Sequence, residues 1–334
     1  MGLPTPILRL MSGGKPVVVG GRTLDAQTQV MAHAARKAPP IEGADPLMVR
    51  AGAAQGFALA GGTLEPGVTT EDFELAGPGG PLPVRAYRPA EQDPQAPVFV
   101  YLHMGGGIIG DLDTGHAFCS MVARAARCPV LSVHYRLAPE HKHPAGLDDS
   151  LFAYRWARDN ADRFGAPVGK AAVGGDSMGG NFSAIIAQDL RAANEPQPVV
   201  QALIYPAVDV ASDTASMTTY ADAYPLSRAM MDWFMGHYLG EGATLTDVRL
   251  SPDKADSVEG LAPAVVVTAG FDPLNDQGAA YADRLRAAGV PVTYRCHDSL
   301  CHGFIGFTGA IRAADTASRE VAALIADAYA GHFS

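Results

Sequence analysis

The 334-residue chain is poor in cysteine, in charged residues and in basic residues. The low cysteine count and the shortage of basic residues each argue against a class of protein. Four cysteines in a chain of this length do not make a disulfide scaffold. Charged residues make up only 18% of the sequence. With 35 acidic against 25 basic side chains, the net charge is −10, which disfavours nucleic acid as a partner. No basic patch, internal repeat or low-complexity segment is visible.

The chain also shows no long uninterrupted apolar run. Residues 1–20 contain Pro4 and Pro6 and no clean apolar core before a cleavage site, so we expect neither a signal peptide nor a membrane span. A cytoplasmic location is therefore the default expectation. Hydrophobic residues make up 48%, which is enough for one large domain or two small ones.

What the chain does contain is a serine between two glycines. Residues 174–181 read GGDSMGGN and stand between a short apolar strand candidate and a helical run. This G-x-S-x-G pattern is typical of a nucleophile elbow, a sharp strand-to-helix turn that presents the serine hydroxyl, here Ser177. The positions two residues either side must be small, and they are Gly175 and Gly179. An ordinary glycine-rich turn can carry the same pattern, but the flanking elements favour a catalytic serine. The spacings of phosphate-binding loops are missing.

Strand and helix patterns alternate from residue 69 onward. We expect strands at 71–75, 82–87, 97–102, 130–134, 171–173, 202–205, 264–269 and 292–296. Helices are expected at 114–126, 146–160, 182–191, 276–288 and 310–329. The alternation predicts an α/β fold with a mostly parallel central sheet flanked by helices.

Two stretches depart from this alternation. Residues 1–65 are Ala-rich and read as helices, one capped by Thr23 and one that starts at Asp45. Residues 208–261 have helix-like segments at 216–223 and 227–239 and no strand pattern. This second stretch, rich in methionine and aromatic residues, would lie over the strand ends, where ligands bind in open α/β sheets. Plain helix packing and an apolar lid are both compatible with it.

A serine nucleophile needs a base and an acid that orients the base. In elbow proteins these follow the serine in the order acid, then histidine. Asp272 follows a late strand candidate, and His302 follows the last one. Asp276 and His297 are the competing choices, and Asp272 could also be a simple helix cap.

Two groups of histidines raise the question of a metal. His297 and His302 lie beside Cys296 and Cys301, but the C-x₄-C spacing fits no common zinc pattern. The second group is His134, His141 and His143, which surround Glu140 and precede the serine. We interpret these histidines as loop and strand-end residues. We therefore expect no metal and no cofactor.

Three glycines follow the expected strand 97–102, in the run His103-Met104-Gly105-Gly106-Gly107. Glycine lets backbone N–H groups approach a ligand closely. A turn is the simpler interpretation, but the position after this strand favours an oxyanion hole, to which the Met178 N–H would also contribute. We expect His103 to hold the loop rather than to react.

Several ordered motifs together resemble the hormone-sensitive lipase family of α/β-hydrolase carboxylesterases. Besides the elbow, they are Tyr101-Leu102-His103, residues 110–114 and 135–140, Leu203-Ile204-Tyr205-Pro206, Asp272-Pro273-Leu274 and His302-Gly303-Phe304. The resemblance implies the α/β-hydrolase fold and a catalytic triad of Ser177, Asp272 and His302. It implies oxyanion donors at the N–H groups of Gly105, Gly106 and Met178. It divides the chain into a helical cap, 1–65 and 208–250, and a catalytic domain, 66–207 and 251–334.

The chain departs from the family pattern at four positions. Met104 replaces the first glycine of the H-G-G-G run, and Gly107 replaces the aromatic residue after it. Met178 replaces the usual alanine after the nucleophile, and His134 stands where Asp or Asn is frequent. The expected substrate pocket comprises Met104, Gly107, Met230 and Phe234, with a vacancy beside the scissile bond where Gly107 replaces the ring.

The resemblance implies a serine carboxylesterase that hydrolyses short-chain esters through an acyl-enzyme. An amidase or lactonase with the same residues is an alternative, as is a non-catalytic ligand-binding protein on this fold. The expected partner is a small ester, with no nucleic acid and no membrane. Some relatives pair through the last strand, which suggests a homodimer by the edge near residues 292–296.

Overall fold

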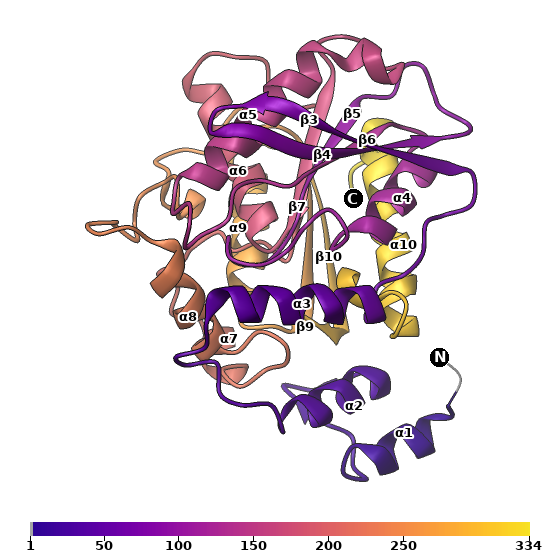
Figure 1. The fold of residues 1–334 in the computed structure, drawn as a ribbon, viewed down its shortest axis with the longest axis vertical. Helices are drawn as coiled ribbons and strands as arrows, with labels where there is room; N and C mark the ends of the chain where they lie inside the picture. The colour runs from indigo at the N-terminus through magenta and orange to yellow at the C-terminus, as the bar shows by residue number, and fades with distance from the viewer. Residues whose placement is uncertain (1–2) are drawn as a thin grey trace.

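The computed structural model describes residues 3–334 and contains an eight-stranded, mostly parallel sheet (Figure 1). The strand order is β10-β9-β8-β7-β5-β6-β4-β3. β3 and β4 form an antiparallel hairpin, and β4 pairs antiparallel with β6. The other six strands run parallel to one another: β6, β5, β7, β8, β9 and β10. The bounds are β3 Val68–Gly77, β4 Gly80–Pro89, β5 Val98–Leu102, β6 Val130–Val133, β7 Ala171–Asp176, β8 Gln201–Ile204, β9 Ala264–Phe271 and β10 Val292–Cys301.

Helices cover both faces of the sheet. On one face α4 packs against α10, and α5, α6 and α9 lie on the other (Figure 1). Their bounds are α4 His116–Ala125, α5 Ala145–Asp159, α6 Met178–Ala192, α9 Asn275–Ala287 and α10 Arg312–Tyr329. Because helices shield both faces, β5, β7 and β9 are buried along their whole lengths, as their continuous apolar sequences require. The predicted fold class is confirmed.

The N-terminal segment forms helices and one small hairpin. Its elements are α1 Thr5–Met11, β1 Val18–Val19, β2 Arg22–Thr23, α2 Ala26–Ala35 and α3 Pro46–Ala60. Asp45 caps α3 as expected, through bonds from the N–H groups of Leu47 and Met48. The predicted cap at Thr23 is wrong: Thr23 lies in β2, and the Asp25 carboxylate accepts the free N–H groups at the start of α2.

Residues 208–261 contain α7 Ala215–Thr219, α8 Arg228–Tyr238 and the 3₁₀ turn η2 Pro252–Lys254. Figure 1 shows α3, α7 and α8 at the same end of the sheet. The indole N–H of Trp233 on α8 donates to the Ala44 carbonyl next to α3, and Arg50 of α3 donates to the Ile108 carbonyl after β5. The first bond joins α8 to the N-terminal segment, and the second joins α3 to the loop after β5.

Several predicted boundaries differ from the structure. β10 extends to Cys301, five residues beyond its expected end, and contains a register shift between His297 and Cys301. The polar run His297-Asp298-Ser299 concealed this continuation, because it lies where the register shifts and β10 pairs with β9 again only at Cys301. The hairpin of β3 and β4 is also longer than expected, because the two strands pair along their whole lengths, from Val68 with Pro89 to Gly77 with Gly80. The helix expected at 216–223 ends at Thr219.

Candidate active site

Ser177 stands at the turn between β7 and α6 in a strained backbone conformation. Its φ of 56° and ψ of −115° lie outside the common regions for a residue with a side chain, a cost of about 1–3 kcal/mol. Gly175 and Gly179 approach the strand next to them so closely that a methyl group on either would overlap the Leu102 carbonyl. The turn is therefore possible only with glycine at both positions, and it presents the serine at the carboxyl edge of the sheet.

A chain of hydrogen bonds joins Ser177, His302 and Asp272. The His302 Nε2 atom lies 2.8 Å from Ser177 Oγ, and its Nδ1 atom lies 2.7 Å from Asp272 Oδ2. Since a carboxylate only accepts, Nδ1 carries the proton and Nε2 is free to accept the serine proton. Asp272 is fully buried, and its Oδ1 accepts a 2.9 Å bond from the Leu274 N–H. The carboxylate is thus fixed on the imidazole.

The two competing residues lie elsewhere. The carboxylate of Asp276 accepts a 2.8 Å bond from the Ser216 N–H at the start of α7. His297 lies within β10, with its ring 5.2 Å from that of Phe304. The structure thus brings Asp272 and His302 to Ser177, and neither Asp276 nor His297.

The glycine loop after β5 rests on buried polar side chains. The Tyr135 hydroxyl donates to the His103 carbonyl at 2.7 Å, and the tyrosine ring stacks on the His103 imidazole at 4.2 Å. His103 Nδ1 donates to the Met104 carbonyl at 2.8 Å. Burial lowers the pKa of His103 to about 4, so the ring is neutral near pH 7. His103 supports the loop, and Gly105 and Gly106 line the same cavity as Ser177 and Met178.

That cavity has a volume of about 410 Å³ and mostly apolar walls. Of the pocket residues expected from the sequence, Met104, Met230 and Phe234 line it. Further apolar side chains come from α3, α7, α8 and η3 (Phe304–Phe307), including Phe57, Met217, Met231, Met235 and Phe307. The methionine-rich stretch 208–261 indicated that its methionines could line a ligand site, but no sequence pattern predicted that Phe57 of α3 would lie in this cavity.

The expectation for Gly107 is wrong. This residue does not line the cavity, and a Cβ atom on it would lie 2.5 Å from the ring of Tyr238. Phe234 lies equally close to Gly106. The two rings stand four residues apart on α8, so they face the same way and fill the space over both glycines. The aromatic wall missing after the glycines is therefore supplied by α8, and no vacancy remains.

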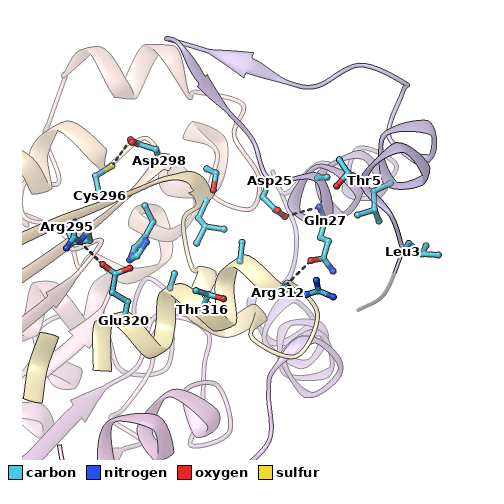
Figure 2. Close-up of a pocket in the computed structure, with 17 residues that line it drawn as sticks. Leu3, Thr5, Asp25, Gln27, Arg295, Cys296, Asp298, Arg312, Thr316 and Glu320 are labelled. Atoms are coloured by element: carbon cyan, nitrogen blue, oxygen red, sulfur yellow. Dashed lines mark hydrogen bonds and ion pairs between the residues drawn. The ribbon is translucent and has the colours of Figure 1, made fainter. Parts of the chain in front are cut away.

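The residues considered as metal ligands do not form one cluster in the structure. Cys296, His297 and Asp298 line a second cavity of about 630 Å³ between the N-terminal segment, β10 and α10; Figure 2 labels Cys296 and Asp298 there. Cys301 is buried, and Glu140 is paired with Arg50 at 2.8 Å. Across residues 3–334, no group of three or more His, Cys, Asp and Glu side chains is arranged to hold a metal. Nor is any helix in that range long and apolar enough to span a membrane.

The chain is similar in sequence and fold to several known proteins. Residues 99–306 match the model of a family described as alpha/beta hydrolase fold. Carboxylic ester hydrolase LipN of Mycobacterium tuberculosis is 42% identical over 315 residues, 91% of this chain and 82% of that protein. Ethyl acetate hydrolase of Pseudomonas putida is 36% identical, with 77% and 82% covered. The structure of ester-hydrolase EH1AB1 from the metagenome of Lake Arreo, in complex with a bipyridine phosphonate derivative, matches with a TM-score of 0.86, 38% identity and coverage of 99% and 100%.

The chain belongs to the α/β-hydrolase family, within its hormone-sensitive-lipase-like carboxylesterases. It is a serine hydrolase of the carboxylesterase class, and its substrates are small esters. The family, fold and enzyme class predicted from the sequence are confirmed.

Proposed function

We propose that Ser177, His302 and Asp272 are the catalytic residues and that this enzyme hydrolyses small, uncharged, short-chain esters. The observation that carries the proposal is the hydrogen-bonded chain of these three side chains, of which Ser177 and His302 line an apolar cavity. Serine hydroxyl, imidazole and carboxylate in this order perform acyl transfer in many unrelated folds.

The proposed reaction has two halves. His302 Nε2 takes the proton of Ser177 as Oγ attacks the ester carbonyl, and Asp272 stabilises the imidazolium that forms. The N–H groups of Gly105, Gly106 and Met178 donate to the developing oxyanion, assisted by the positive end of α6. His302 then protonates the leaving alcohol. In the second half, water attacks the acyl-enzyme by the same route and releases the acid.

The size of the cavity limits the substrate. At roughly 30 Å³ per water-sized group, 410 Å³ holds on the order of a dozen non-hydrogen atoms, which fits a short-chain ester. The charged side chains in the lining are already paired: Asp209 with Lys254 at 2.7 Å and Arg228 with Asp232 at 3.3 Å. A charged substrate would have to replace one of these pairs, so we expect neutral esters to be preferred.

We propose further that residues 3–65 and 208–250 act as a two-part cap over the catalytic residues. Phe57 of α3 and Phe234 of α8 line the cavity from opposite parts of the chain. Six methionines surround it: Met104, Met178, Met217, Met230, Met231 and Met235. Because methionine side chains are flexible and polarisable, such walls adapt to different acyl and alcohol groups.

A panel of p-nitrophenyl esters with acyl chains from acetate upward, together with matching anilides and lactones, tests this proposal. We expect turnover of the short esters, a sharp decline once the acyl chain exceeds the cavity, and little hydrolysis of anilides. Preferential hydrolysis of anilides or lactones would make the enzyme an amidase or lactonase. Saturable binding without turnover would make it a ligand-binding protein.

The expected location and assembly are also proposals. A cytoplasmic location fits the four cysteines, which are all free and thus suit a reducing compartment. A homodimer could form through β10, because it is an outer strand of the sheet. Cell fractionation tests the first, and analytical ultracentrifugation of wild type against Tyr294→Pro, which would interrupt that strand, tests the second.

A further inference from the structure

A buried carboxyl group that the proposed reaction does not use stands directly before the nucleophile. Asp176 is the last residue of β7 and has no exposed surface. Its Oδ1 atom accepts a 2.6 Å hydrogen bond from the Tyr101 hydroxyl, and its Oδ2 atom accepts a 2.9 Å bond from the Tyr205 hydroxyl. Both tyrosines are themselves fully buried. Since burying a carboxyl is costly unless its oxygens are bonded, these two hydroxyls are what retain it here.

Tyr205 connects this carboxyl to the imidazole of His302. The centres of the two rings lie 4.8 Å apart, with the planes tilted by 58°. Tyr205 follows β8 with a φ of 34°, in the left-handed region that a bulky residue rarely adopts. Its backbone N–H is held by the Val267 carbonyl at 2.6 Å. The chain therefore sustains local strain to keep the hydroxyl on Asp176 and the ring against His302.

Asp176 and His302 also interact through their charges. Burial raises the pKa of Asp176 to about 6, against the opposing effect of the two tyrosine hydroxyls and of the His302 charge. The coupling is reciprocal, so an ionised Asp176 favours the protonated imidazole. The other titratable groups in this buried region are Tyr135 and the thiol of Cys119 on α4, whose pKa values are raised by burial and which are uncharged near pH 7.

We propose that Asp176, Tyr101 and Tyr205 form a positioning network for His302, which holds the imidazole through the Tyr205 ring and supplies negative charge that favours the imidazolium. The imidazolium exists only after His302 has taken the serine proton, so the charge assists the transition state more than the bound substrate. The network complements Asp272, which fixes the ring at Nδ1. No bond changes at Asp176. The inference rests on the proposed catalytic role of His302.

Two variants and a matched control test the proposal. Tyr205→Phe keeps the ring and removes its bond to Asp176, and Asp176→Asn removes the charge. Tyr154→Phe is the control, because its hydroxyl is equally buried and lies against the Ala171 carbonyl at the other end of β7. For each protein, kcat and KM are measured for a short p-nitrophenyl ester from about pH 5 to pH 9, alongside the unfolding temperature.

We expect both network variants to lose about 10–100-fold in kcat with little change in KM, as for a displaced catalytic group. Without the charge at Asp176, the imidazole protonates less readily. Since the pKa of Asp176 is raised only to about 6, the wild-type carboxyl is charged through most of the pH range of the assay, and the acid limb of kcat/KM in Asp176→Asn should move to lower pH. Tyr205→Phe removes one of the two hydroxyls that oppose the raised pKa of Asp176, so Asp176 loses part of its charge and the acid limb should move in the same direction as in Asp176→Asn, but less. The control should keep wild-type kcat and the wild-type acid limb.

Two results would overturn the network. One is wild-type kcat and an unmoved acid limb in both variants. The other is a loss of unfolding temperature that matches the control, with the turnover of the folded protein unchanged, since that describes a structural role alone. Failure of the underlying catalytic proposal looks different: the wild type would then hydrolyse no ester, or Ser177→Ala would retain the activity.

Discussion

Replacing Gly107 by alanine separates the contact with Tyr238 from the cost of the backbone conformation. Gly107 has a φ of 75°, where a side chain costs about 1–2 kcal/mol. Its new Cβ would also lie 2.5 Å from the Tyr238 ring, and overpacking of this kind costs a further 1–3 kcal/mol or so. The free energy of unfolding should therefore fall by about 2–5 kcal/mol in total.

Gly260→Ala is the matched control. Gly260 has a φ of 72°, and a Cβ on it would meet nothing within 4 Å, so this variant shows the conformational cost alone. Urea unfolding of both variants gives the contribution of the Tyr238 contact as their difference.

The ester panel reports on the same substitution. The Gly107 carbonyl accepts a 2.8 Å bond from the Ala138 N–H, and the neighbouring N–H groups are the proposed oxyanion donors. A shift of this loop should lower kcat/KM for every ester alike, by about 100-fold or more. Equal unfolding free energies for the two variants, with a loss confined to bulky esters, would refute this reasoning and restore a vacant pocket at Gly107.

Three other predictions concern the catalytic acid, the buried His103 and the need for a metal. Asp272→Asn should lower kcat about 10⁴-fold by favouring the wrong imidazole tautomer, whereas Asp276→Asn should cost only about 1 kcal/mol of stability at the start of α7; comparable kinetic losses would reassign the acid. His103, whose pKa burial lowers from 6.5 to about 4, contributes stability that is present above pH 6.5 and lost as the pH falls toward 4. That contribution is on the order of 3 kcal/mol, and His103→Gln should flatten this part of the urea-unfolding profile. Dialysis against EDTA should leave ester turnover unchanged, and a loss that zinc restores would point to a metal at the residues near Cys296.

The fold could be predicted from the sequence because its strongest signals are local. The elbow pattern around Ser177 requires glycine for steric reasons, and the buried strands are continuously apolar because helices cover both faces. Two predicted boundaries were wrong for different reasons. The cap of α2 is local, since the Asp25 carboxylate accepts from the N–H groups of Gln27 and Thr28, but Thr23 offered an equally good capping residue two positions earlier. The end of β10 depends on contacts with other parts of the chain. In its second half β10 pairs with β9 only at His297 and Cys301, and between them the Ser299 carbonyl accepts from the Asp25 N–H.

The same contrast between local signals and distant contacts applies to the active site. That Asp272 and His302 lie beside Ser177 could be predicted, because each follows a strand in the order that an elbow protein requires. The packing over the glycine loop was missed because Tyr238 is more than 100 residues from Gly107, and no local pattern joins them. The buried partners of Asp176 were missed for the same reason, since Tyr101 and Tyr205 come from two different strands.

The most direct test of the central claim is to locate the nucleophile. The enzyme is treated with a p-nitrophenyl phosphonate ester, digested, and analysed by mass spectrometry, with Ser177→Ala treated in parallel. We predict one phosphonate per chain, on the peptide that contains Ser177, with complete loss of ester turnover. Ser177→Ala should take up no phosphonate, keep the wild-type unfolding temperature and lose on the order of 10⁴-fold or more in kcat. A phosphonate on another residue, or more than a few per cent of the turnover in Ser177→Ala, would contradict the account.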